Sequence, residues 1–240
     1  MKVLEANSDL KSYSIETKTN TKVLLELFGE PIVFSDEVHL AGDIDLENKE
    51  FAANVTKSTG SDGDITEMNF ELYLVDGYGY LKDNSGWTKT SMDEEMWQSY
   101  GDAMMEINKF LEILKNSTVE KLEIVEEYGS SYYAIKFSLD LEDVEEFLSG
   151  RDGFEDLDSY LVESERNLSV ELLVDKETFI IRNIKTNLHF KSMASNDEEN
   201  ELGMDSTFEM NYFDERTISN LDKGIFIRLP EEAKSATLIY

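Results

Sequence analysis

The side chains that perform most enzymatic chemistry are scarce in this sequence. It contains two histidines, His39 and His189, and no cysteine among its 240 residues. Thiolate catalysis, disulfides, zinc ribbons and iron–sulfur clusters are therefore excluded. His189 alternates in phase with Lys185 and Lys191, and His39 likewise falls on a polar strand face. This pattern favours solvated strand histidines over a metal ligand or the base of a catalytic triad.

Segments that look like phosphate or calcium loops lack their key residues. Residues 77–79 (GYG) lack the third glycine and the lysine of known phosphate-binding loops, and they favour a hairpin turn. Residues 43–47 begin like a calcium loop, but Asn48 occupies the position of the turn glycine and Asn54 that of the bidentate glutamate. Acidic residues are so frequent that no pair stands out for glycoside hydrolysis. We therefore predict a protein that is not an enzyme and that has no cofactor and no metal site.

The charge of the chain narrows the choice of partners. It has 52 acidic and 22 basic residues, a net charge of −30, distributed along the whole sequence. Such a field repels phosphate backbones and anionic lipid headgroups, so nucleic acid is not an expected partner. With 40% hydrophobic residues the chain can still build a core. No run approaches the roughly 18 to 20 apolar residues that span a bilayer, and residues 1–10 lack the apolar core of a signal peptide.

Much of the chain alternates apolar and polar residues with a period of two, which predicts strands with one face in water. The clearest runs lie at residues 68–74, 135–141, 168–174, 184–190 and 208–212. Short turn signals such as Asp76-Gly77 and Asp175-Lys176 separate them. Because parallel strands need a long crossover between each pair, these short connections favour an antiparallel meander.

Residues 91–116 break the alternation and predict a helix. Ser91 is its expected N-cap, acidic residues fill the first turn, and Lys115 lies in the last turn. A second helical segment is expected over residues 141–163, with glycines at 150 and 153 interrupting it. The first helix carries a regular apolar stripe, whose simplest role is packing against the sheet. Its methionine and aromatic content would also make an adaptable cover over a curled, open sheet, with a lipid-sized space beneath.

Several short phrases connect this pattern to a known superfamily. Residues 75–82 (VDGYGYLK) and 86–89 (GWTK) form a hairpin motif before the central helix, residues 172–178 (LLVDKET) a turn motif, and residues 226–233 (FIRLPEEA) a closing motif. Their order and spacing, over about residues 10–236, resemble the LolA-like superfamily of cell-envelope lipoproteins and lipoprotein carriers. The resemblance implies a half-barrel of antiparallel strands whose concave apolar side is covered by helices and holds acyl chains.

The sequence departs from the superfamily at two points. Carrier members place an arginine inside the cavity, and the sequence does not indicate which arginine would take that place. The candidates are Arg151, Arg166, Arg182, Arg216 and Arg228. Lipoprotein members begin with a lipidated cysteine, which this chain lacks. We therefore expect that a signal segment and a lipid-attachment motif preceded residue 1.

From the residues and the resemblance together we predict an α+β fold, with a strongly curved antiparallel half-barrel sheet and helices covering its concave face. Residues 8–240 form a single domain, and residues 1–7 are a disordered N-terminal remnant. The predicted function is non-catalytic binding or carrying of a lipid or acyl chain by a monomer outside the cytoplasm. A removed N-terminal lipid anchor would tether it to the membrane. The expected ligand-binding residues are Trp97, Tyr100, Met104, Ile107, Phe110 and Leu111.

An alternative from a different functional class remains open. The same fold with a filled interior would bind no ligand, and its acidic exterior or loops would contact another protein as an extracytoplasmic interaction module. The size of the interior distinguishes the two, since an acyl chain needs a space that a packed core does not leave.

Overall fold

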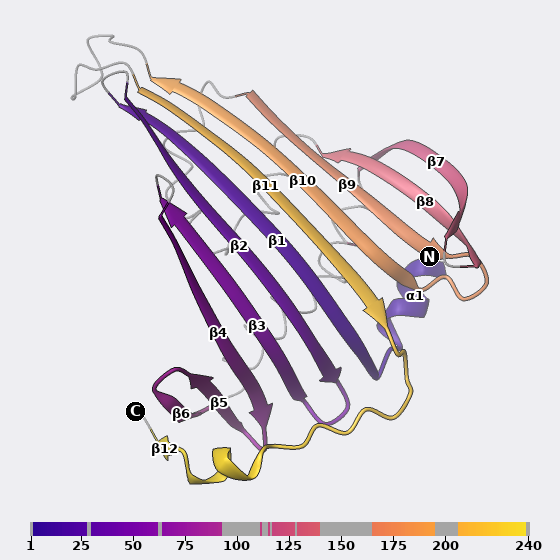
Figure 1. Ribbon diagram of the computed structural model, residues 1–240. Helices are drawn as coiled ribbons and strands as arrows, with labels where there is room; N and C mark the ends of the chain where they lie inside the picture. Colours follow the sequence, from indigo (N-terminus) through magenta and orange to yellow (C-terminus); the bar gives the residue numbers. More distant parts are fainter. Residues whose placement is uncertain are drawn as a thin grey trace.

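The computed structural model describes residues 2–27, 30–61, 64–92, 111, 115, 117–127, 129–139, 165–194 and 206–238. Over these residues the chain is mostly β, with twelve strands in one sheet and a short N-terminal helix (Figure 1). The elements are, in chain order, α1 (Lys2–Ser8), β1 (Ser12–Leu27), β2 (Glu30–Asp45), β3 (Glu50–Ser61), β4 (Asp64–Val75), β5 (Tyr78–Asp83), β6 (Gly86–Ser91), β7 (Thr118–Glu127), β8 (Ser130–Leu139), β9 (Glu165–Asp175), β10 (Ile181–Ala194), β11 (Ser206–Ser219), the 3-10 helix η2 (Glu231–Ser235) and β12 (Thr237–Leu238).

The sheet consists of two meanders joined side by side. Its strand order is β12-β6-β5-β4-β3-β2-β1-β11-β10-β9-β8-β7. Strands β1 to β6 follow one another in sequence, as do β7 to β11, and the pairing of β1 with β11 unites the two groups. Every pair is antiparallel except β12 with β6, which is parallel and two residues long. The predicted antiparallel meander is therefore confirmed for the described strands.

The predicted alternation sets the strand faces. Met68, Phe70, Leu72 and Leu74 lie in register with every second residue of β3, where Leu74 pairs with Phe51. Leu168, Val170, Leu172 and Val174 of β9 are all buried, as are Ile184, Leu188 and Phe190 of β10. Because side chains on one strand alternate between faces, these residues share a single face of the sheet.

The turns form where the sequence predicts them. Asp76 and Gly77 join β4 to β5, and both have positive φ values, 54° and 75°. Glycine adopts this conformation without strain and aspartate tolerates it, so the pair suits a tight hairpin. At the end of β9, the Asp175 carboxylate accepts hydrogen bonds from the backbone N–H groups of Glu177 and Thr178. Burial alone would raise the pKa of Asp175, but these bonds and the Thr178 hydroxyl lower it.

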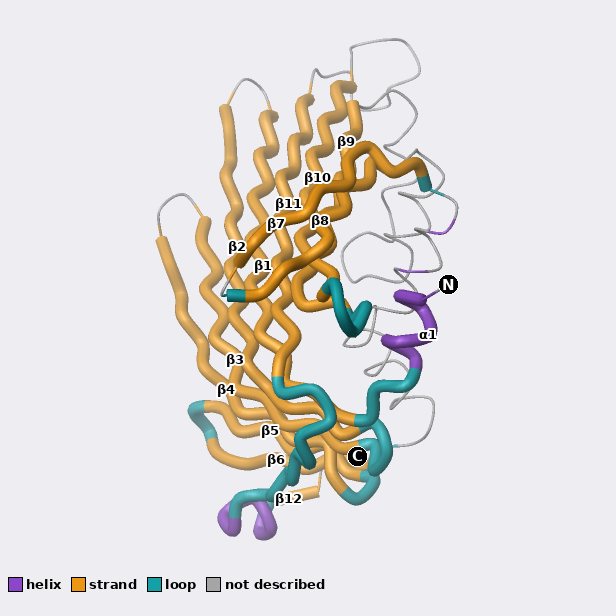
Figure 2. The backbone as a smooth tube through the Cα atoms, turned by 90° about the vertical axis from the view of Figure 1, so that its right-hand side faces the viewer, coloured by secondary structure: helices purple, strands orange, loops and turns teal. Residues whose placement is uncertain are grey.

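The two ends of the chain are held against the sheet. Val3 and Leu4 of α1 pack against the hydrophobic core, and Figure 2 shows this helix standing to one side of the strands. Asn7 is buried, accepts a hydrogen bond from the backbone N–H of Ile181 and donates one to the carbonyl of Phe179. The expectation of a disordered remnant at residues 1–7 is therefore wrong for residues 2–7. Their apolar side chains and this amide anchor them to the turn before β10.

The C-terminal segment runs along one end of the sheet, from β11 in its middle to the edge at β6 (Figure 1). There, Ala233 of η2 is fully buried, and β12 adds to the edge of β6. In the part of the chain that the structure describes, no helix combines the length and apolar content needed to cross a membrane.

The predicted helices fall mostly outside the described residues. Ser91, the expected N-cap, instead ends β6, where it pairs with Tyr78 in the hairpin ladder. Of residues 92–116, Leu111 and Lys115 are described within helix, as predicted. The second predicted helix, residues 141–163, lies entirely outside the described ranges.

Candidate functional site

One face of the sheet, which we call the apolar face, gathers most of the hydrophobic side chains. Its most deeply buried members include side chains on β3 and β9 that are at most 2% exposed and belong to one hydrophobic cluster. We call these the closed zone: Phe51, Leu168, Val170, Leu172 and Val174. Complete burial of such a side chain contributes about 1.5–3 kcal/mol to the free energy of unfolding.

The same face continues into a region that water reaches, on β1, β2 and β4. Phe34 is 44% exposed and Met68 is 40% exposed, and their neighbours are half-buried. We call this the open zone: Val23, Phe34, Val38, Met68 and Phe70. Strand register brings these residues to one region of the sheet: Val23 pairs with Phe34, while Lys57 separates Val38 from Met68. Lys57 forms a 3.6 Å ion pair with Asp36 on this face.

The predicted ligand-binding residues can be placed only in part. Leu111 is 7% exposed and belongs to the same hydrophobic cluster as the closed zone. It therefore packs against the apolar face of the sheet. The other five, Trp97, Tyr100, Met104, Ile107 and Phe110, lie outside the described residues.

Between the apolar side chains of β11 lies a polar cluster that the sequence analysis did not predict. The Asp214 side chain is 4% exposed, and its Oδ2 atom lies 2.8 Å from Nε of Arg216. Its Oδ1 atom accepts a hydrogen bond from the Thr19 hydroxyl at 2.8 Å. Thr186 is buried on the neighbouring strand in register with Asp214. The alternation of β11 carries the signal, because Asp214 and Arg216 are in phase with Met210 and Tyr212.

This ion pair is largely shielded from water, which strengthens the attraction between its two charges. Burial takes both groups out of water, and each then depends on the other to offset the lost hydration. Arg216, one of the five candidate arginines, lies on the apolar face and is held by an acid on its own strand. The cluster adds a fixed polar point to this face, which also carries the Lys57–Asp36 pair.

Tyr13 lies at the end of the apolar face nearest α1. Its side chain is almost fully buried, and burial raises the pKa of its hydroxyl to about 12, against a smaller lowering by the Arg216 charge. A phenol in this position stays neutral at physiological pH, because a charged phenolate would lose its hydration. Tyr13 therefore packs as an apolar group in the core.

The opposite face of the sheet, which we call the polar face, carries both histidines. His39 lies 3.1 Å from Glu16, and His189 lies 3.0 Å from Asn211. Both side chains are more than 40% exposed, which confirms the prediction of solvated strand histidines. Near the loop that begins like a calcium site, Asp45 accepts hydrogen bonds from the backbone and side-chain nitrogens of Asn48, as a turn cap does. Among the described residues, no group of three acidic or histidine side chains is arranged to hold a metal ion.

Comparison with models of protein families identifies the family to which the chain belongs. The model of a family of unknown function, DUF6612, matches residues 1–237. The chain therefore belongs to this family. No curated protein matches its sequence.

Solved structures show a distant likeness. The lipoprotein LppX from Mycobacterium tuberculosis is 10% identical, with a TM-score of 0.48, over 95% of this chain and 94% of that chain. LprF from Mycobacterium bovis is 10% identical, with a TM-score of 0.47, over 95% of this chain and 93% of that chain. The resemblance to LolA-like lipoproteins is confirmed as a similarity of structure. At this level of likeness no property of either protein is transferred to this chain.

Proposed function

We propose that this protein binds the acyl chain of a lipid or lipoprotein non-covalently on its apolar face, outside the cytoplasm. The observation that carries the proposal is the open zone, a set of large apolar side chains around the Lys57–Asp36 pair that the described fold leaves partly in water. Exposed apolar surface of this kind marks a site where another apolar body binds. An acyl chain fits because contact with apolar side chains on neighbouring strands is not directional.

The energetics favour a ligand of several methylene groups. Each methylene that leaves water contributes about 0.8 kcal/mol, before the cost of ordering the ligand is deducted. Phe34 and Met68 supply an aromatic ring and a flexible thioether, which adapt to chains of different shape. The polar cluster of Asp214, Arg216 and Thr19 borders the open zone on the same face, because Thr19 pairs with Val38, and it would limit how far an apolar chain extends.

The geometry that the superfamily resemblance implies completes this proposal. A strongly curved half-barrel would wrap the apolar face around the ligand, and helices would cover its concave side. In that arrangement Trp97, Tyr100, Met104, Ile107, Phe110 and Leu111 form the lining opposite the open zone. Burial of Leu111 in the core cluster supports a helix at this place. The protein would act as a monomer tethered at the cell envelope by an N-terminal lipid.

Two measurements test the proposal. The purified protein is extracted with organic solvent and the extract is analysed for lipid by mass spectrometry. The delipidated protein is then titrated with a fluorescent fatty acid, and energy transfer from tryptophan reports binding. Extracted lipid and saturable binding of the probe are the expected results. No lipid and no saturable response would leave the filled-core alternative, a module that contacts other proteins.

A matched pair of substitutions on β4 tests the location. Met68 lies on the apolar face, whereas Ile65, which is 76% exposed, lies on the polar face of the same strand. Met68→Asp combined with Phe34→Asp is expected to weaken binding of the fatty acid at least about tenfold, because a charge replaces apolar contact. Ile65→Asp is expected to leave it unchanged. Equal effects of both changes would contradict binding on the apolar face.

A further inference from the structure

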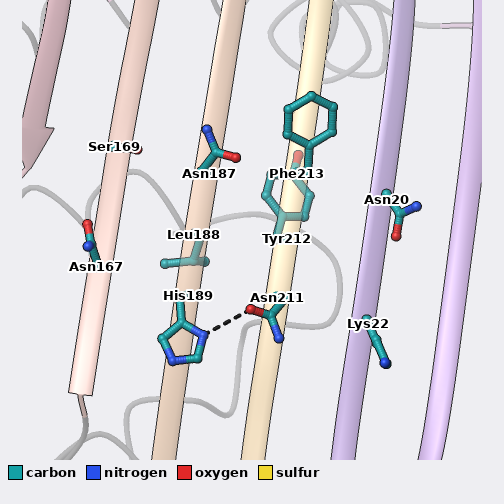
Figure 3. Close-up of a pocket in the computed structure, with 10 residues that line it drawn as sticks. All are labelled: Asn20, Lys22, Asn167, Ser169, Asn187, Leu188, His189, Asn211, Tyr212 and Phe213. Atoms are coloured by element: carbon teal, nitrogen blue, oxygen red, sulfur yellow. Dashed lines mark hydrogen bonds between the residues drawn. The ribbon is translucent and has the colours of Figure 1, made fainter.

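The polar face carries a hollow that the proposed lipid site does not involve. It has a volume of about 390 Å³ and lies across β1, β11, β10 and β9 (Figure 3). Amide side chains supply most of its polar lining. We call the following residues the amide patch: Asn20, Asn167, Asn187, Asn211, His189 and Phe213. Leu188 and Tyr212 also line the hollow, but their alternation places their side chains on the apolar face.

The amide patch differs in charge from the rest of this acidic chain. No carboxylate lines it, although the chain has 52 acidic residues. Three other hollows in the described part of the chain each have two acids in their lining. Glu209 and Glu215 of β11 flank the patch; they lie 3.9 Å from Lys191 and 3.5 Å from Lys185, and Glu209 also lies 4.0 Å from Nδ1 of His189. The lining itself offers no carboxylate to a cation, and apart from Lys22 its polar side chains are amides, a hydroxyl and an imidazole.

The patch offers both hydrogen-bond donors and hydrogen-bond acceptors. Each asparagine presents two N–H donors and one carbonyl acceptor. Asn211 accepts a hydrogen bond from Nδ1 of His189 at 3.0 Å, which is possible only with the proton on Nδ1. In the neutral ring Nε2 is then an acceptor. Ser169 adds a hydroxyl, so the hollow can meet groups that donate and accept at the same atom, as sugar hydroxyls do.

The arrangement of the patch suits an elongated ligand. Its side chains span four adjacent strands, three steps of about 4.8 Å, or roughly 14 Å across the sheet. Phe213 lies near the middle in register with both Asn20 and Asn187. An aromatic ring beside amides offers an apolar surface for the C–H side of a ring ligand, with polar partners for its edge.

We propose that the amide patch binds a short neutral oligosaccharide that lies across β1, β11, β10 and β9. A sugar ring presents a C–H face toward Phe213 and hydroxyls toward the amides. An anionic ligand is disfavoured, because Lys22 is the one basic lysine in the lining and the chain as a whole carries −30. An extended peptide is disfavoured because the patch lies on the face of central strands, whose backbone groups are already paired.

The test uses neutral trisaccharides of three linkage types as probes. Cellotriose, maltotriose and triacetylchitotriose are added separately to the isotope-labelled protein, and the side-chain amide resonances of asparagine are followed by NMR. At least one probe is expected to shift the resonances of Asn187 and Asn211 in a saturable way. The absence of any shift at about 10 mM probe, well above a dissociation constant of about 1 mM, would overturn the proposal.

Matched variants distinguish the patch from a general effect of the surface. Asn187→Ala and Asn211→Ala are each expected to weaken binding at least about fivefold, and Phe213→Leu to weaken it while retaining most of the apolar volume. Asn69→Ala is the control, an asparagine on the polar face of β4 that bonds to Thr56. Loss of binding in Asn69→Ala equal to that in the patch variants would overturn the proposal.

The same variants separate this site from an anion site and from the proposed lipid site. Lys22→Ala is expected to leave sugar binding unchanged, and inorganic phosphate is expected not to compete. Competition by phosphate, removed by Lys22→Ala, would show an anion site and overturn the proposal. The patch variants are expected to bind the fluorescent fatty acid normally, since the two sites lie on opposite faces of the sheet.

Discussion

The closed zone and the open zone are built from the same kind of residue on the same face of the sheet, but only one of them is covered. Phe51 in the closed zone is fully buried, whereas Phe34 in the open zone is 44% exposed. Both are phenylalanines in strands of the same meander, and both lie on its apolar face. The alternation decides which face a side chain joins, and the elements packed above that face decide whether water reaches it.

The largest expected difference between the zones is in stability. Phe51→Ala removes a fully buried ring and leaves a cavity, so it is expected to lower the free energy of unfolding by about 3–5 kcal/mol. Phe34→Ala is expected to lower it by less than about 1 kcal/mol in the ligand-free protein, because its ring already contacts water. Urea denaturation followed by circular dichroism measures both. Equal losses would show that the open zone is covered in solution.

The polar cluster of β11 provides the next test. Asp214→Ala is expected to lower the free energy of unfolding by about 3 kcal/mol, because Arg216, whose side chain is 14% exposed, loses the carboxylate that offsets its charge. Replacing both residues by apolar ones, Asp214→Leu with Arg216→Met, is expected to recover much of that loss. A double variant no more stable than Asp214→Ala would contradict this explanation of the cluster. Urea denaturation of the three proteins gives the comparison.

The smallest expected effect concerns pH at the buried end of the face. Because burial raises the pKa of Tyr13 from 10.0 to about 12, the stabilisation from its neutral form is complete below pH 10. It is lost as the pH rises through about 12, and amounts to roughly 2–3 kcal/mol. Tyr13→Phe cannot ionise and is expected to unfold at higher pH than the native chain. The midpoint of alkaline unfolding, followed by circular dichroism, measures the difference, and an unchanged midpoint would contradict it.

The faces and ends of the strands in the second meander could be predicted from the sequence, because the alternation of side chains and the turn residues within each segment determine them. Leu168, Val170, Leu172 and Val174 alternate without interruption and are bounded by the turn signal at Asp175, so their face and extent follow directly. The pairing of β1 with β11 could not be read in this way. It joins residues about 200 positions apart, and the residues of neither segment indicate which strand it pairs with.

Less of the candidate site than of the strands could be predicted from the sequence. Leu111, a member of the predicted stripe, is buried in the core cluster, but the stripe could not show which strand residues of the apolar face remain exposed. Asp214 and Arg216 were missed because charged residues at apolar positions look like a break in the strand pattern. Their compensation depends on Thr19, which reaches them only through the long-range pairing of β1 with β11. The amide patch likewise exists only after four strands are in register.

The central position of β1 has a consequence for how the chain folds while it is being synthesised. Strand β1 is synthesised before β2 and β11 and can pair with β2 early, but its other edge pairs with Ser206–Ser219 of β11. Loop closure over such a distance is slow, and the sheet has a gap in its middle until β11 has been synthesised. A truncated product that lacks β11 therefore exposes the unpaired backbone groups of one edge of β1 and the apolar side chains beside it. Chaperones and proteases would bind such a surface.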